Sequence, residues 1–166
     1  MGLWRRSGVL ATAAVGAALS LGCTATGVSP HACTEIGAPS GVAVTVVREA
    51  VAPAMTLTLR ICQADCVEQP VDLVPGSITV GATCDSADPD ASCSASSSPD
   101  GTMRGFVDVP ALTVGDVRIS GELRAGASRT RLEEITVTAE ATYPNGRDCP
   151  AGGPQASIRV TGAGLR

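Results

Sequence analysis

Residues 55–73 read MTLTLRICQADCVEQPVDL, and this stretch decides the fold class. Two alternating segments, Met55–Cys62 and Cys66–Val74, lie on either side of the short polar sequence Gln63-Ala64-Asp65. Alternation with a period of two is typical of strands that bury one face. A three-residue polar loop between two such runs predicts a β-hairpin.

The hairpin also predicts its own register. Pairing residues across the loop gives Cys62 opposite Cys66, Arg60 opposite Glu68, Ile61 opposite Val67, Leu57 opposite Val71 and Met55 opposite Leu73. One face is then apolar and the other is polar, and a shift of one residue would exchange the two. Pro70 cannot donate a ladder hydrogen bond, so we expect the second strand at an edge or a bulge.

Similar Val- and Thr-rich segments recur along the chain between Gly, Pro, Asp and Ser residues. They predict strands at Val42–Val47, Ser77–Ala82, Arg104–Val109, Val114–Arg124, Leu132–Tyr143 and Ala156–Thr161. Short strands with frequent turn signals favour an all-β, antiparallel β-sandwich of immunoglobulin-like architecture over residues 33–166. The acidic and serine-rich residues 85–101 break the pattern and are interpreted as a surface loop.

Two of these strands carry charged residues on one face. Arg118, Glu122 and Arg124 alternate with apolar residues in one, and Glu134 and Glu140 do so in the other. Each strand is therefore expected to bury one side and expose the other. The charged face is interpreted as solvated surface, with a binding stripe as the alternative.

The N-terminus predicts an export signal over residues 1–22. A short basic segment, Met1–Arg6, precedes the apolar and small-residue run Gly8–Leu21. This run is shorter than the ~20 apolar residues that a membrane-spanning helix needs. Cleavage after Ala25-Thr26-Gly27, with secretion of the chain, is one way for the signal to end.

The sequence Ser20-Leu21-Gly22-Cys23 resembles the lipobox of bacterial lipoproteins, although Leu is usual where Ser20 stands. The resemblance implies that Cys23 is lipidated and that residues 23–32 form a tether. The protein would then be anchored on the extracytoplasmic face of the cell membrane. All 12 basic residues are arginine, and the signal, the cysteine spacing and the Val/Thr-rich strands together resemble small exported lipoproteins of actinobacteria.

The cysteines predict disulfide bonds. Of the seven, six remain when Cys23 is set aside, and six cysteines allow fifteen pairings. The hairpin register pairs Cys62 with Cys66, and Cys84 with Cys93 would close the base of the acidic loop. By elimination Cys33 pairs with Cys149. A metal site is the competing use of paired cysteines, but an exported chain with one histidine favours disulfides.

The composition argues against several kinds of chemistry. The histidine, His31, lies beside the tether and is poorly placed for a catalytic triad. Without lysine there is no Schiff-base chemistry. The exported region keeps two aromatic residues, Phe106 and Tyr143, so a stacking platform for sugars is not expected. A formal net charge of −4 disfavours nucleic acid as a partner.

These observations predict a non-catalytic binding or cell-envelope accessory module without a cofactor or metal. Its partners would be the membrane, through the anchor, and an envelope protein or a cell-wall component. The alternative is a small secreted hydrolase that uses paired carboxylates, such as Glu133 or Glu134 with an aspartate.

Overall fold

The computed structural model describes residues 33–88 and 90–166. The chain divides into two units, Met1–Ala32 and Cys33–Arg166. The signal, the lipidation site Cys23 and the tether lie outside the described residues and stay predictions. The regular structure of the second unit consists of one 3-10 turn, η1 (Arg48–Ala50), and the strands β1 (Gly41–Val46), β2 (Met55–Cys62), β3 (Cys66–Val71), β4 (Val74–Cys84), β5 (Cys93–Asp108), β6 (Gly115–Ala125), β7 (Ser128–Ala141), β8 (Pro154–Thr161) and β9 (Gly164–Leu165). The all-β class is confirmed.

The strands form one mixed sheet in the order β3-β2-β6-β7-β8-β1-β5-β4, with β9 paired to β8. This corrects the finer prediction, because β1 and β8 are parallel and no separate immunoglobulin-like pair of sheets is shown. The link between the two halves is β7. It pairs with β6 along most of its length and with β8 only through Glu140 and Ala141.

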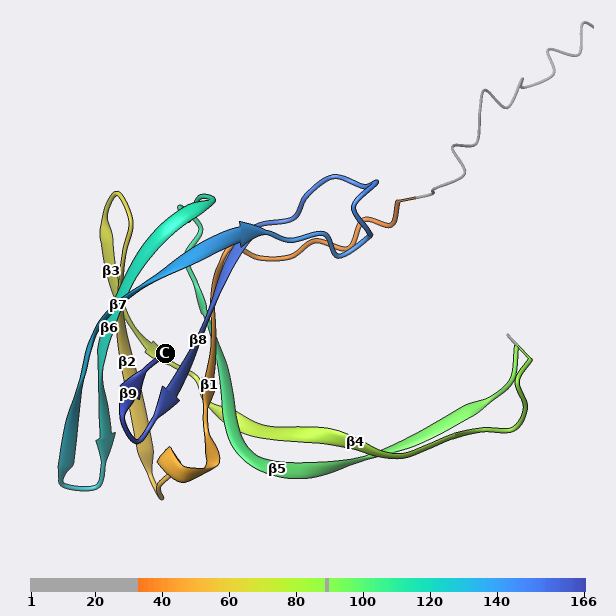
Figure 1. The fold of residues 1–166 in the computed structure, drawn as a ribbon, viewed down its shortest axis with the longest axis horizontal. Coiled ribbons are helices and arrows are strands. Elements are labelled where there is room, and N and C mark those ends of the chain that lie inside the picture. Colours follow the sequence, from red (N-terminus) through yellow and green to blue (C-terminus); the bar gives the residue numbers. More distant parts are fainter. Residues whose placement is uncertain (1–32, 89) are drawn as a thin grey trace, which may run out of the picture. The chain divides into compact units, whose positions relative to one another are not determined.

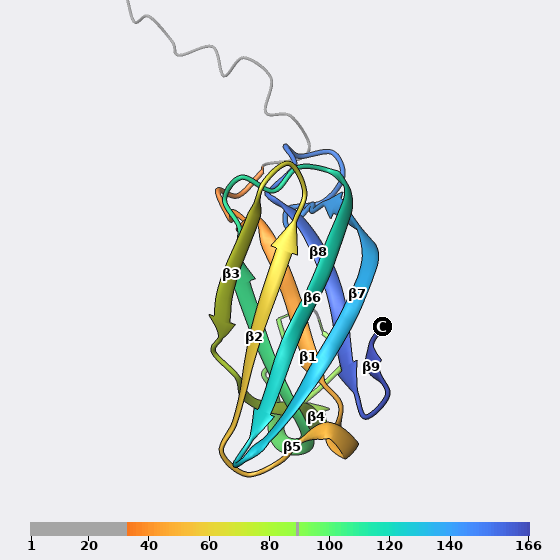
Figure 2. The ribbon, with the colours of Figure 1, turned by 90° about the vertical axis from the view of Figure 1, so that its left-hand side faces the viewer.

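The hydrophobic core lies between the two halves of this sheet. Figure 2 shows β3, β2, β6 and β7 side by side, with β1, β5 and β8 behind them. The largest fully buried side chains come from both halves: Leu57, Leu59, Ile61, Ile119, Leu132, Val42, Val44, Val46, Val107, Val117 and Val160. Full burial of one such side chain contributes about 1.5–3 kcal/mol, so the aliphatic core stabilises the fold without aromatic residues.

The β2–β3 hairpin has the predicted register. Cys62 pairs with Cys66, Arg60 with Glu68, Ile61 with Val67 and Leu57 with Val71. The prediction for Pro70 is also confirmed, because β3 lies at one end of the strand order. The three disulfides are those predicted: Cys33–Cys149, Cys62–Cys66 and Cys84–Cys93.

The segment before β1 lies along the segment between β7 and β8. Cys33 is bonded to Cys149, and the side-chain amide of Asn145 donates to the carbonyl oxygen of Ile36 at 2.9 Å. The amide of Gly153 donates to the carbonyl oxygen of Ala38 at 2.8 Å. These contacts hold the beginning of the folded unit against the connection between β7 and β8.

The interpretation of residues 85–101 as a loop was wrong in part, because β5 already begins at Cys93. β4 and β5 continue as a two-stranded ribbon beyond the strands that they join in the core (Figure 1). We call residues 77–84 and 93–99 the arm. Most of its side chains are exposed, and its threonines pair with serines across the two strands.

Candidate binding groove

A groove of about 490 Å³ lies on the outer face of β2, β3, β6 and β7. This face is turned toward the viewer in Figure 2. The lining residues are mostly charged or polar: Thr58, Arg60, Glu68, Ser120, Gly121, Glu122, Arg124, Arg131, Leu132, Glu133 and Glu134. We call this feature the charged groove.

The strand register places these side chains in rows across the sheet. Arg60 lies between Glu68 on β3 and Ser120 on β6. In the next row, Glu122 lies between Thr58 on β2 and Arg131 on β7. Neighbours on one face of a sheet lie close enough for long side chains to interact. The groove therefore presents positive and negative groups next to each other.

A β-bulge brings Glu133 and Glu134 into the groove together. Ile119 pairs with Ile135, but Gly121 pairs with Leu132, so two residues of β7 oppose the single residue Ser120. In a regular strand, consecutive side chains point to opposite faces. Here both glutamates line the groove, because the extra residue interrupts the alternation.

Arginines lie beside the carboxylates of this face. Arg118 and Glu134 are 3.6 Å apart, Arg131 and Glu133 are 3.7 Å apart, and Arg124 contacts Glu122. Pairs as exposed as these each contribute at most about 1 kcal/mol to stability. Their main consequence is an ordered pattern of charge on an open surface.

Gly121 is the glycine of the groove lining, and the side chain that it lacks would face the core. A β-carbon at this position would lie 2.4 Å from the carbonyl oxygen of Thr58 and 2.9 Å from a methyl group of Leu59. The absent side chain would point toward the buried Leu59, so the core packs closely against the backbone beneath the groove.

The predicted hydrolase would pair Glu133 or Glu134 with an aspartate, and the structure bears on the glutamates of that prediction. Glu133 and Glu134 line the same groove, whereas the carboxylates that accompany them are Glu68 and Glu122 and not an aspartate. The sequence contained a signal for the bulge. Leu132 is buried three residues before the inward-facing Ile135, and a three-residue interval breaks the period of two.

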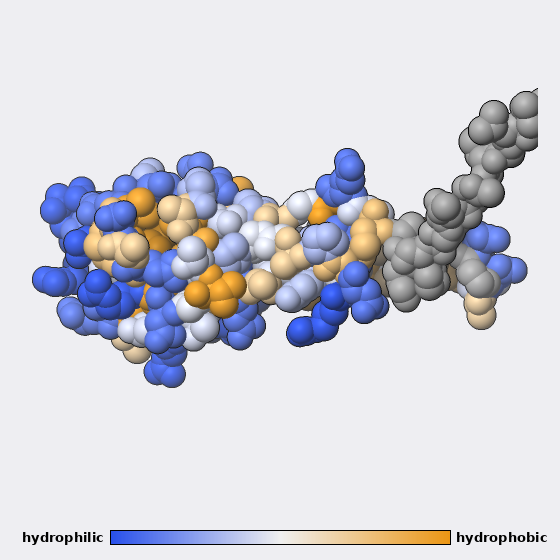
Figure 3. Space-filling model, turned by 90° about the horizontal axis from the view of Figure 1, so that it is seen from above, coloured by the Kyte–Doolittle hydropathy of each residue, from blue (hydrophilic) through white to orange (hydrophobic). Residues whose placement is uncertain are grey.

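The described residues bear on two further features, a metal site and a membrane-spanning helix. No group of three or more His, Cys, Asp or Glu residues there is arranged to hold a metal ion. Within the same ranges, no helix has the length and apolar character needed to cross a membrane. Figure 3 shows hydrophilic residues over much of the surface above the strands, with small apolar patches between them.

Comparison with known proteins gives no relative from which a role can be transferred. No family model matches the chain, and neither a curated protein nor a solved structure matches it. The likeness to exported actinobacterial lipoproteins therefore stays a prediction from the sequence.

Proposed function

We propose that the protein is a lipid-anchored binding module on the extracytoplasmic face of the cell membrane. Its charged groove would hold an extended segment of an envelope protein that carries charges of both signs. The observation that carries this proposal is the groove itself, where three arginines and four glutamates alternate across four strands. Three disulfides support an extracytoplasmic location, because such bonds persist in oxidising compartments.

The chemistry of the lining favours a peptide over a sugar. Guanidinium groups bind carboxylates through paired hydrogen bonds, and carboxylates accept from the cations of a partner. The lining contains no aromatic ring on which a sugar would stack. Binding would then depend on matched charges, which set orientation and specificity.

A direct test is affinity capture from solubilised envelope with the full chain. Arg60→Glu reverses a charge inside the groove, and Arg159→Glu makes the same change on β8, outside the groove lining. We expect the wild-type chain and Arg159→Glu to retain a partner that Arg60→Glu loses. Equal capture by all three chains would contradict a role for the groove.

The anchor is tested separately by Cys23→Ala. We expect this substitution to move the chain from the membrane fraction to the soluble fraction. A chain that stays with the membrane after Cys23→Ala would contradict lipidation as the means of attachment.

A hydrolase is the second candidate, because the bulge places Glu133 and Glu134 side by side. Catalytic carboxylic acids are usually made by burial, which keeps one of them protonated. The side chains of Glu133 and Glu134 are instead 85% and 45% exposed. A hydrolase would lose turnover with Glu133→Gln or Glu134→Gln and keep it with Glu140→Gln, whereas a binding module shows no turnover in any of them.

A further inference from the structure

The arm ends the sheet in an unprotected edge. β4 is the last strand in the order, and its pairing partner is β5. Natural proteins usually protect such an edge with charged residues, because an open edge accepts another strand. No charged residue occurs from Val74 to Cys84, nor from Ala91 to Pro99 on the other side of the arm.

Apolar side chains are exposed on this edge strand. Ile78 is 52% exposed and Val80 is 39% exposed, and both belong to the same face of β4. Their partners on β5 are Ser98 and Ser96, which cannot cover them. An isolated two-stranded ribbon is marginally stable in water, and additional strands stabilise it.

The base of the arm is held by a defined set of contacts. Gly76 is buried where the register shifts, and a β-carbon there would lie 2.1 Å from the hydroxyl oxygen of Thr102. The carboxylate of Asp100 accepts hydrogen bonds from the Thr102 amide at 2.8 Å and from Arg104 at 3.0 Å. Arg48 of η1 donates to the Asp100 carbonyl oxygen at 3.1 Å.

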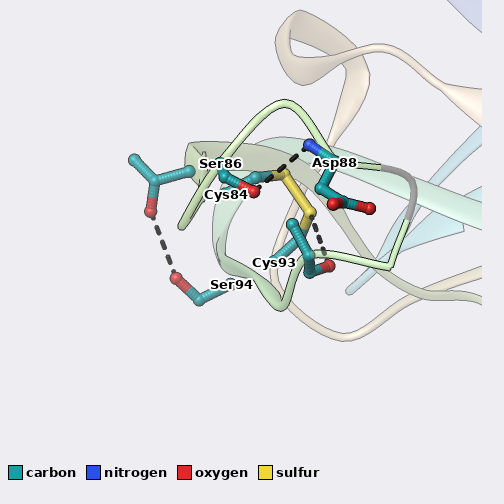
Figure 4. The surroundings of a disulfide bond; sticks show 7 residues. Cys84, Ser86, Asp88, Cys93 and Ser94 are labelled. Carbon is teal, nitrogen blue, oxygen red and sulfur yellow. Dashed lines mark hydrogen bonds between the residues drawn. A yellow bond between two sulfur atoms is a disulfide. The ribbon is translucent and has the colours of Figure 1, made fainter.

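The tip of the arm is also fixed. The Cys84–Cys93 disulfide joins the two strands, and the Asp85 amide donates to the Ser92 carbonyl oxygen at 3.0 Å. Figure 4 shows the disulfide with Ser94 on one side and with Ser86 and Asp88 on the other. The hydroxyl groups of Thr83 and Ser94 are 3.2 Å apart, and the Asp88 amide donates to the Ser86 hydroxyl. A ribbon constrained at both ends loses little entropy when a further strand is added.

We propose that β4 pairs antiparallel with β4 of a second copy of this chain, about a two-fold axis at Thr79. In that register Ile78 of each copy lies opposite Val80 of the other. Two copies then share a four-stranded sheet, with apolar cross-strand pairs at its centre.

The charge distribution places a contact between two copies at the arm rather than elsewhere on the surface. Each chain carries a formal net charge of −4, so contact between copies through charged faces is repulsive. The arm is uncharged on both strands, so an antiparallel pair of identical β4 strands brings no like charges together between Val74 and Cys84. A self-complementary surface of this kind is what a two-fold interface requires.

Two double variants test this register. Ile78→Lys with Val80→Lys places like charges opposite each other in the pair. Ile78→Lys with Val80→Glu places opposite charges at the same positions of the pair. This second variant is as polar as the first. We expect the first to weaken self-association of the full chain by about ten-fold or more relative to the second.

Sedimentation velocity of the detergent-solubilised full chain measures the effect, and the anchor is the same in every variant. A cysteine trap provides the second measurement. Thr79→Cys should give a disulfide-linked dimer, because two strands paired about this residue bring the sulfur atoms within bonding reach. Ser97→Cys, on the neighbouring strand of the arm, should not.

A monomeric wild-type chain at micromolar concentrations would overturn the proposal. Equal association of the two double variants would also overturn it, because the contact would then lie elsewhere. Arg60→Glu, in the groove, should leave self-association unchanged. The dimer and the proposed binding function can therefore fail independently.

Discussion

At the residue scale, Gly121 shows how the close packing beneath the groove depends on one missing side chain. The atom nearest to a new β-carbon would be a backbone oxygen of β2, which cannot turn aside. We expect Gly121→Ala to lower the free energy of unfolding by about 1–3 kcal/mol, as overpacking does elsewhere. Urea unfolding followed by circular dichroism measures the loss.

Gly162→Ala is the matched control for that substitution. A β-carbon at Gly162 meets nothing within 4 Å. The free energy of unfolding of the Gly162→Ala variant should stay within about 0.5 kcal/mol of the wild-type value. An equal loss in both variants would show that the close packing at Gly121 is not the cause.

Asp100 at the base of the arm gives a prediction for pH dependence. The side chain and then the amide of Thr102 lower the pKa of this carboxyl by hydrogen bonding, and Arg104 adds a smaller effect. The contribution of Asp100 to stability is therefore complete above the ordinary aspartate pKa of about 3.9. It is lost as the pH falls through the lower pKa of the folded protein.

The titration is visible at the Thr102 amide, which binds the carboxylate. We expect its nitrogen chemical shift to titrate with a midpoint below the ordinary aspartate value. Asp100→Asn should abolish the transition while keeping an acceptor oxygen. A midpoint at or above the ordinary value would contradict the hydrogen-bonded arrangement.

At the element scale, the β2–β3 hairpin was predictable because the local sequence pattern determines it. The register of β2 and β3 follows from alternation and from a loop of three residues, so the sequence alone identifies the pairs. The serine-rich start of β5 has no such alternation, because neither face of the arm is buried, and a loop was expected there. The start of β5 is a strand because it pairs with β4 through ladder hydrogen bonds, and not because one of its faces is buried.

The groove was less predictable than the hairpin. The charged faces of β6 and β7 follow from alternation, but the bulge that brings Glu133 and Glu134 into the groove together depends on how β7 pairs with β6. A break in period between Leu132 and Ile135 marks the bulge in the sequence. The opposing strand must be known before that break can be interpreted.

The three disulfides differ in the length of chain that they close, and this predicts different effects. Cys33 and Cys149 are separated by 116 residues, and Cys84 and Cys93 by nine. In the chain-entropy model the first bond contributes about 5 kcal/mol and the second about 2.5 kcal/mol. We expect Cys33→Ala with Cys149→Ala to lower the urea midpoint of the core more than Cys84→Ala with Cys93→Ala does. The reverse order would contradict this account.

At the scale of the whole folded unit, the parallel pairing of β1 and β8 joins its first strand to its last but one. Val42, Val44 and Val46 on β1 lie opposite Ala156, Ile158 and Val160 on β8, and all six are buried. This pairing connects strands about 110 residues apart and leaves no local signal, as is usual for parallel contacts. An antiparallel architecture was therefore the natural expectation from the sequence.

The same organisation predicts two levels of stability within one chain. Core residues of both halves of the sheet form a single cluster, so the amides of β1 and β8 should exchange with solvent only when the whole unit opens. In β4, Gly76 at the base is the buried residue, and the strand beyond it is exposed. In the variant with Ile78→Lys and Val80→Lys, we expect residues 77–83 to exchange roughly a hundred-fold faster than residues 42–46. Hydrogen exchange measured by mass spectrometry on the two segments tests this difference. Equal protection in that variant would show that the arm opens only with the core, and that it is not a separate element added to it.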